Sequence, residues 1–128
     1  MVSVVVPTLN SERVLGDCLA SVVAQDLQNG ALEIVVADAG STDRTRRIAE
    51  DYGATIIDNP LRTGEAGKAA ALRVAHGDFA CFVDSDNILL ERDWLLRMLR
   101  PFEDPAIVAS EPMRYAHRPS DNYLTRYF

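Results

Sequence analysis

The sequence has no excess of positive charge and no long apolar run. Its 13 lysine and arginine residues are outnumbered by 19 aspartate and glutamate residues, so the formal net charge is -6. That balance argues against a surface for nucleic acids or anionic membranes, and any phosphate-bearing partner is expected to be small. No apolar run approaches the roughly 20 residues of a transmembrane helix. Residues 2–6 follow Met1 without the basic stretch of a secretory signal, so we expect a cytoplasmic protein.

Cysteine and histidine are scarce, with two of each. Cys18 and Cys81 are far apart and lie in apolar patterns, which is typical of small buried side chains and not of a metal site. His76 and His117 are isolated, and His76 precedes Gly77 at the predicted end of a helix, where a cation suits the helix dipole. We therefore predict no metal site built on thiolates or imidazoles.

Short apolar runs alternate with amphipathic segments along the chain. Runs of β-branched and other apolar residues predict strands at residues 2–7, 32–37, 54–57, 79–83 and 106–109. Helical spacing predicts helices at residues 15–23, 45–52, 68–75 and 94–99, with Asn10 or Ser11 capping the first and residues 40–43 capping the second. This alternation predicts a single α/β domain over residues 1–128, with a mostly parallel sheet between two layers of helices.

Polar loops follow the first, second and fourth predicted strands, and we expect them to meet at the carboxyl edge of the sheet, where α/β proteins bind ligands. They carry four carboxylates, at Asp38, Asp43, Asp84 and Asp86. Paired carboxylates on a loop suit Mg²⁺ or Mn²⁺, which keep several waters and also hold substrate phosphates. A second interpretation stays open for the sequence DSDN, because Asp84 and Asp86 would also serve as turn or helix-capping residues.

Other nucleotide-binding motifs are incomplete. The segment GEAGKA resembles a P-loop, but Ala69 follows Lys68 where that motif needs Ser or Thr, and Arg62 stands in place of its first glycine. Lys68, near a predicted helix N-terminus, either faces a phosphate or is simply solvated. A phosphatase of the haloacid-dehalogenase kind would need catalytic loops downstream of Asp86, and the short remainder of the chain offers no convincing ones. Residues 7–10 also lack the glycines of a dinucleotide-binding turn.

Four segments together resemble the nucleotide-sugar glycosyltransferases of family 2, which have the GT-A fold. They are VSVVVPTLNSE at residues 2–12, LEIVVADAGSTDRT at 32–45, GEAGKAAALRVAHGDFACFVDSDN at 64–87 and DWLLRML at 93–99. Each segment alone is a weak signal, but four in the family's order and spacing are specific. The resemblance implies a Rossmann-like α/β/α fold of three layers, truncated in this chain. It also implies transfer of a sugar from a nucleoside diphosphate to an acceptor.

The resemblance implies roles for single residues of the donor site. Pro7, Thr8 and Asn10 match the segment that contacts base and ribose. Asp38 matches an aspartate that accepts a hydrogen bond from the base, as the N3–H of uracil would allow. Gly64 and Lys68 match the loop and helix start near the ribose and the diphosphate.

A metal site is implied by the same resemblance. Asp84 and Asp86 match the family's Asp-x-Asp motif, with Asp84 near the ribose and the metal and Asp86 holding Mg²⁺ or Mn²⁺ against the diphosphate. Such a cation neutralises charge that grows on the departing nucleoside diphosphate. The expected donor is a uridine diphosphate sugar, with a guanosine diphosphate sugar as the alternative, and the acceptor is an unnamed sugar or lipid.

Two features depart from the family pattern. Ala39 replaces the second aspartate of the common Asp-Asp-Gly-Ser. Inverting members take an acidic general base from a later loop, and here only Glu111 and Asp121 qualify, by residue type alone. Because Leu124, Tyr127 and Phe128 look like the start of a helix, we expect a fragment whose acceptor half and general base are missing.

The prediction from sequence is thus the donor-binding half of an inverting, metal-dependent glycosyltransferase, which in a longer form could lie at the membrane periphery. The alternative is a non-catalytic nucleotide-binding module of the same fold. A nucleotidyltransferase would need a glycine-rich loop with a basic residue after the first strand, and PTLNSER lacks the glycines.

Overall fold

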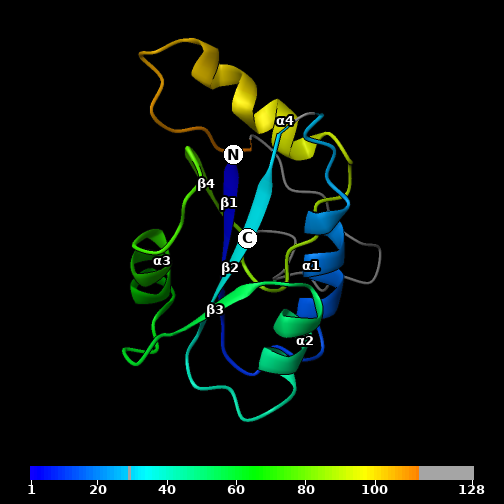
Figure 1. Ribbon diagram of the computed structural model, residues 1–128, viewed down its shortest axis with the longest axis vertical. Helices are drawn as coiled ribbons and strands as arrows, with labels where there is room; N and C mark the ends of the chain where they lie inside the picture. The colour runs from blue at the N-terminus through cyan, green and yellow to red at the C-terminus, as the bar shows by residue number, and fades with distance from the viewer. Residues whose placement is uncertain (29, 113–128) are drawn as a thin grey trace, which may run out of the picture. The chain divides into compact units, whose positions relative to one another are not determined.

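Four parallel strands form the centre of the structure, a computed structural model that describes residues 1–28 and 30–112 (Figure 1). The strands are β1 (Val2–Thr8), β2 (Leu32–Asp38), β3 (Thr55–Asp58) and β4 (Phe79–Phe82). Their order across the sheet is β3-β2-β1-β4, and every pairing is parallel. The sequence predicted all four strands, and each predicted end lies within one residue of the observed end.

The two central strands carry most of the core. Val4, Val5 and Val6 of β1 have no exposed area, and the same holds for Val35 and Val36 of β2. A strand buried on both faces reads as a continuous β-branched run and not as an alternating pattern, because helices cover both sides of the sheet. Burial of each such side chain contributes about 1.5–3 kcal/mol.

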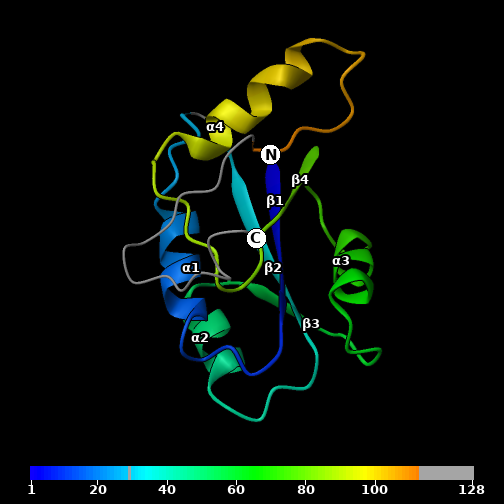
Figure 2. The same cartoon turned by 180° about the vertical axis from the view of Figure 1, so that it is seen from behind.

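Helices cover both faces of the sheet. Figures 1 and 2 show α1 (Leu15–Val23) and α2 (Thr45–Asp51) on one face and α3 (Gly64–Leu72) on the other. Helix α3 approaches β1 and β2 closely at Gly67, where an added Cβ would lie 3.2 Å from the Cβ of Ala37 and 3.4 Å from that of Pro7. Glycine therefore lets α3 approach the sheet closely, because an added Cβ would crowd these two residues and Nδ2 of Asn59, which would lie 2.9 Å away.

The topology creates one reversal of strand order. The chain moves outward from β1 to β2 and β3, then returns across α3 to β4 on the other side of β1. In open α/β sheets, ligands bind at the carboxyl ends of the strands that flank such a reversal. The carboxyl ends of β1 and β4 therefore define the place where a ligand site is expected.

The chain divides into two compact units, Met1–Leu96 and Arg97–Phe128. Helix α4 (Trp94–Leu99) spans the boundary and continues as a 3₁₀ helix, η1 (Arg100–Glu103), with Pro101 in its first turn. No helix within residues 1–28 and 30–112 is long and apolar enough to cross a membrane.

The structure corrects three expectations about local structure. Residues 106–109 do not form the predicted fifth strand, since all four are exposed and none pairs with another strand among the described residues. Helix α3 ends at Leu72 and not at residue 75. Helix α1 has no side-chain cap, because its N-cap position is Val14, and the polar groups of Asn10 and Ser11 are bonded to other partners.

Candidate functional site

The sequence DSDN forms a turn directly after β4. The N–H of Val83 continues the pairing by donating to the carbonyl of Val5 at 3.0 Å, and the N–H of Asn87 then donates to the carbonyl of Asp84 at 2.9 Å. Asp84 and Asp86 are both exposed on this turn. DSDN is thus a turn closed by backbone atoms, and it presents two carboxylates at the carboxyl edge of the sheet.

Helix α1 and the loop before it contact this turn. The hydroxyl of Ser85 lies 3.1 Å from that of Ser11, and the Cys18 thiol donates to the carbonyl of Asp84 at 3.7 Å. Burial, together with the negative charges of Asp86 and Asp84, raises the pKa of the Cys18 thiol to about 12. Cys18 therefore stays a neutral packing residue at ordinary pH, as predicted.

Lys68 faces the same turn from the opposite side of the sheet. Its Nζ lies 3.6 Å from Oδ1 of Asp84 and 5.9 Å from the centroid of the Phe82 ring. The lysine sits on the second turn of α3, which Thr63 caps by accepting a hydrogen bond from the N–H of Ala66. Lys68 is consequently directed at the DSDN turn and is not a freely solvated lysine.

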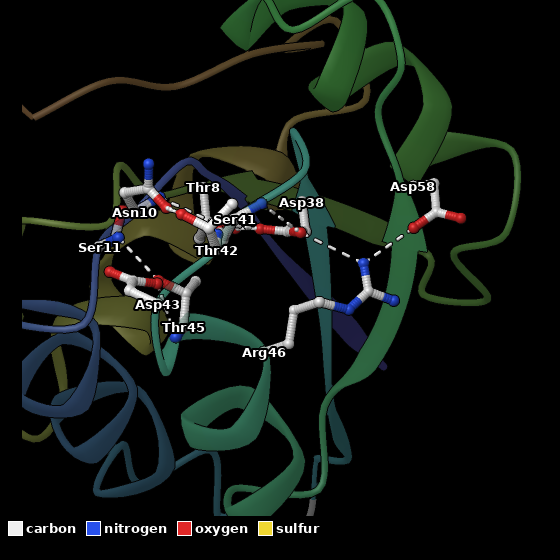
Figure 3. Close-up of polar contacts among 10 residues, drawn as sticks. All are labelled: Thr8, Asn10, Ser11, Asp38, Ser41, Thr42, Asp43, Thr45, Arg46 and Asp58. Carbon is white, nitrogen blue, oxygen red and sulfur yellow. Dashed lines mark hydrogen bonds and ion pairs between the residues drawn. The ribbon is translucent and has the colours of Figure 1, made fainter.

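The loops after β1 and β2 are bonded to each other (Figure 3). The N–H of Asn10 donates to the Ser41 hydroxyl at 2.8 Å, and Oδ1 of Asn10 accepts the N–H of Thr42 at 2.9 Å. The N–H of Ser11 donates to the Thr45 hydroxyl at 2.7 Å. Asn10 has a φ of +49°, a left-handed conformation that asparagine tolerates better than most residues. The two loops thus form one structural unit.

Asp43 belongs to this loop unit and not to a metal site. Its Oδ1 accepts the N–H of Thr45 at 2.9 Å, and its Oδ2 accepts the N–H of Glu12 at 3.1 Å. The N-cap of α2 is Arg44, without a side-chain cap, so the cap predicted from residues 40–43 is not formed. Burial would raise the pKa of Asp43, but the hydrogen bonds from Thr45 and Glu12 outweigh it and lower that pKa. The carboxylate is therefore engaged within the protein.

Asp38, at the end of β2, is buried and fully hydrogen-bonded. Its Oδ1 accepts the hydroxyls of Thr8 and Ser41, and its Oδ2 accepts the N–H of Ser41 at 3.0 Å and Nη1 of Arg46 at 3.2 Å. The side chain has no exposed area. Burial acts to raise the pKa of Asp38, but the four hydrogen bonds lower it below its ordinary value. Asp38 is thus a charged anchor for the loop, and its direct contact with a base stays a prediction.

Sequence reasoning missed Arg46 and Asp58, which extend this network to β3 (Figure 3). The same Nη1 of Arg46 that bonds Asp38 also donates to Oδ1 of Asp58 at 2.8 Å. Hydrogen bonds to Asp58 and Asp38 raise the pKa of Arg46. The available signal was an arginine in the first turn of a helix, facing two strands that each end in aspartate.

A pocket of about 150 Å³ opens beside this network, between the ends of β2 and β3. Its lining comes from the two loops that follow these strands, at Asp38, Ala39, Gly40, Asp58, Asn59, Pro60 and Arg62. Among these residues Asp58 has an exposed carboxylate, which can accept hydrogen bonds from a polar ligand.

The four aspartates expected to cluster do not form one site. Asp38 and Asp43 are bonded within the protein, which leaves Asp84 and Asp86 as the exposed pair, and residues 1–28 and 30–112 contain no group of three side chains that could hold a metal ion. Mg²⁺ and Mn²⁺ are commonly bound by one or two carboxylates together with waters and substrate phosphates. The exposed pair fits a cation that arrives with a diphosphate.

The other predicted residues are placed as follows. Thr8 is buried against Asp38, Pro7 lies in β1 against α3, and Gly64 opens α3 with free space where a Cβ would be. Glu111 is exposed. Asp121, Leu124, Tyr127 and Phe128 lie outside the described residues.

This chain is similar to known sugar transferases. The model of the family "Glycosyl transferase family 2" matches residues 3–127. The poly(ribitol-phosphate) beta-N-acetylglucosaminyltransferase TarS of Staphylococcus aureus is 39% identical over 93 residues, which are 68% of this chain and 16% of that protein. An N-acetylglucosaminyltransferase of Mesorhizobium japonicum is 34% identical over 133 residues, 98% of this chain and 31% of that protein. The chain thus spans less than a third of the length of these relatives.

Solved structures have the same fold. TarS 1–349 in complex with UDP-GlcNAc superposes with a TM-score of 0.68 and 31% identity, over 80% of this chain and 32% of that one. The mannosyltransferase PcManGT of Pyrobaculum calidifontis, in complex with GDP-Man and Mn²⁺, superposes with a TM-score of 0.77 and 28% identity, over 83% of this chain and 33% of that one. These likenesses establish the GT-A fold expected from the sequence.

Proposed function

This chain belongs to glycosyltransferase family 2, and from that membership we propose that it forms the donor-binding part of an enzyme that transfers a sugar from a nucleoside diphosphate. The observation that carries the proposal is the position of the DSDN turn. Asp84 and Asp86 lie exposed beside the reversal of strand order, with Lys68 facing them from α3. A diphosphate needs such a set of groups, namely a cationic side chain and carboxylates for a cation that neutralises its charge.

A divalent cation, Mg²⁺ or Mn²⁺, is the proposed cofactor, with Asp86 as the principal ligand and Asp84 as the second. When bound, the cation would supply electrostatic stabilisation to the departing diphosphate. Lys68 contributes a positive charge next to the proposed cation site, since its Nζ lies 3.6 Å from Oδ1 of Asp84. The Mn²⁺ in the complex of PcManGT supports this assignment.

A uridine diphosphate sugar is the favoured donor, and a guanosine diphosphate sugar is the alternative. The complexes of TarS with UDP-GlcNAc and of PcManGT with GDP-Man support both possibilities. In the proposed site Pro7, Thr8, Asn10, Asp38 and Gly64 belong to the segments that shape the nucleotide pocket. The acceptor is a sugar or a lipid, and the transfer is of the inverting type.

The general base is proposed to come from a segment other than the three loops of the donor site. Such a base typically contributes about 10²- to 10⁴-fold to the rate. In the donor loops Asp38 and Asp43 are committed to hydrogen bonds within the protein. Asp84 and Asp86 are assigned to the cation, so no carboxylate of these loops remains for the acceptor hydroxyl.

The proposal also treats residues 1–128 as a single donor-binding domain. The enzyme would be cytoplasmic, and in a longer form it would lie at the membrane periphery.

A non-catalytic nucleotide-binding module of the same fold is the second candidate, because the donor loops alone would serve it equally well. Calorimetric titration of the chain with UDP, GDP, CDP and ADP, in Mn²⁺ and in EDTA, tests the shared nucleotide site. The proposal expects binding of UDP or GDP that strengthens at least about tenfold with Mn²⁺. Release of nucleoside diphosphate from a bound nucleotide sugar then separates the enzyme from the module. Absence of all nucleotide binding would contradict both candidates.

A further inference from the structure

The chain between the DSDN turn and α4 lies beside α1 (Figures 1 and 2). The N–H of Leu89 donates to the hydroxyl of Ser21 at 3.0 Å, and the N–H of Asp26 donates to the carbonyl of Arg92 at 2.7 Å. The side chains of Leu89 and Leu95 are both buried. This segment is therefore attached to the helix by hydrogen bonds and by apolar packing.

Gln25, directly after the C-cap of α1, bonds to the same segment through its side-chain amide. Its Nε2 donates to the carbonyls of Glu91 at 2.8 Å and Ser21 at 3.3 Å, and its Oε1 accepts the N–H of Leu95 at 2.9 Å. Leu95 lies in the first turn of α4, where backbone N–H groups have no partner within their own helix. An amide offers both the donor and the acceptor that these bonds need, so Gln25 caps α4 and bonds to the loop before it.

The same face of α1 also contacts the DSDN turn. Cys18, whose thiol donates to the carbonyl of Asp84, precedes Ser21 by three residues and Gln25 by seven. Positions with this spacing fall on one face of a helix. One face of α1 and the residue that extends it therefore bond to the chain on both sides of Asp86, before it at Asp84 and after it up to the start of α4.

We propose that Gln25, together with Ser21, is a positioning residue for the divalent cation. Neither side chain touches the cation. Both stabilise the loop conformation that places the carboxylate of Asp86, which is exposed and has no hydrogen bond or ion pair of its own within residues 1–28 and 30–112. The backbone of the loop thus sets where this carboxylate lies. The inference rests on the proposed function and names two residues outside the donor loops that the function needs.

Calorimetric titration of UDP and GDP, in Mn²⁺ and in EDTA, tests this role through the gain in nucleotide affinity that Mn²⁺ produces. Gln25→Leu removes the hydrogen bonds of the amide and leaves an apolar side chain of similar size. Ser21→Ala removes the hydroxyl to which the N–H of Leu89 donates. Ser3→Ala is the matched control, because it also removes a buried hydroxyl that accepts a backbone N–H, that of Gly77 at 2.7 Å, but at the amino edge of the sheet.

The Mn²⁺-dependent gain separates positioning from a merely structural role, which would lower stability in all three variants and leave the gain unchanged. We expect the gain to fall at least about threefold in Gln25→Leu and in Ser21→Ala, toward the roughly tenfold or larger losses seen for direct partners of metal ligands. Affinity in EDTA and the gain in Ser3→Ala should stay at the wild-type values. An unchanged gain in either folded variant, or an equal fall in Ser3→Ala, overturns the inference alone. A wild type that binds no nucleotide, or gains nothing from Mn²⁺, overturns the proposed function instead.

Discussion

The two aspartates of the DSDN turn differ in what already holds them. Asp84 lies 3.6 Å from Lys68 through its side chain and accepts the thiol of Cys18 through its carbonyl. Asp86 is exposed, and no hydrogen bond or ion pair fixes its carboxylate within residues 1–28 and 30–112. A residue with a free carboxylate can turn toward a cation without breaking an existing contact. This difference is the reason for assigning the principal metal-binding role to Asp86.

Replacement of Asp86 by asparagine should therefore affect the cation and not the fold. The turn is closed by backbone atoms of Asp84 and Asn87, which the change leaves in place. Loss of one charged ligand is expected to reduce the Mn²⁺-dependent gain in nucleotide affinity by roughly tenfold or more. Titration of UDP and GDP with and without Mn²⁺ measures that gain, with Asp51→Asn as the control. A folded Asp86→Asn variant with the wild-type gain would show that DSDN is only a turn.

Individual side chains show where sequence reasoning reaches its limit. The sequence correctly predicted that Asp38, Asp43, Asp84 and Asp86 lie at or after the carboxyl ends of strands, because apolar runs locate the strand ends. Their partners could not be predicted. Whether Asp38 is exposed or bonded to Arg46 depends on how α2 packs beside β2 and β3, which is a tertiary contact.

The elements of the fold follow closely from local pattern. Buried β-branched runs predicted the strands, and the apolar stripe at Leu15, Leu19 and Val22 predicted α1, because packing against the sheet requires that periodicity. The errors lie where polar residues have more than one use. Asn10 and Ser11 have good capping side chains, but α1 begins after Val14, and the two side chains bond to the next loop and to the DSDN turn.

The connection between α3 and β4 depends on a close approach at Gly77. A Cβ at this position would lie 2.6 Å from the backbone nitrogen of Ser3 and still closer to the Ser3 hydroxyl. Gly77→Ala should therefore lower the free energy of unfolding by about 1–3 kcal/mol, as expected for overpacking. Chemical denaturation measures the change.

Gly16→Ala is the matched control for this prediction. Gly16 lies in α1, and a Cβ there would meet no atom within 4 Å. Alanine is the better helix former, so the control should raise stability by up to about 1 kcal/mol. Equal effects of the two substitutions would mean that the Ser3 contact does not constrain the connection.

At the scale of the whole molecule, the sheet has two chemically different edges. Its carboxyl edge carries the DSDN turn and the pocket, whereas its amino edge carries a closed network. There Glu33 accepts hydrogen bonds from the Ser3 hydroxyl and from the backbone N–H groups of His76 and Gly77. This network ties β1 and β2 to the start of β4 and serves stability, away from the proposed ligand.

The network predicts a loss of stability in acid. Hydrogen bonds from Ser3 and then from His76 lower the pKa of Glu33 from 4.5 to about 2, despite the opposing effect of burial. A carboxylate whose pKa is lower in the folded state stabilises the fold above its unfolded pKa, and that contribution disappears as the pH falls from 4.5 toward 2. Chemical denaturation between pH 7 and pH 2.5 measures the free energy of unfolding. This free energy should decline less in Glu33→Gln than in the wild type. Glu50→Gln, on the surface of a helix, is the control. If the free energy of unfolding declines equally in Glu33→Gln and Glu50→Gln, the network does not stabilise the charged form of Glu33.

The proposed function requires that a nucleoside diphosphate and a cation bind together at the carboxyl edge of the sheet. Paramagnetic broadening in the amide NMR spectrum of this 14.1 kDa chain locates the cation directly. On titration with Mn²⁺ in the presence of UDP or GDP, the amides of residues 84–87 should broaden first. Those of Ser3, Glu33 and Gly77 should stay sharp, and broadening at 84–87 should weaken without nucleotide. Broadening centred on the amino edge, or equally strong without any nucleotide, would show that the cation and the nucleotide do not share this site.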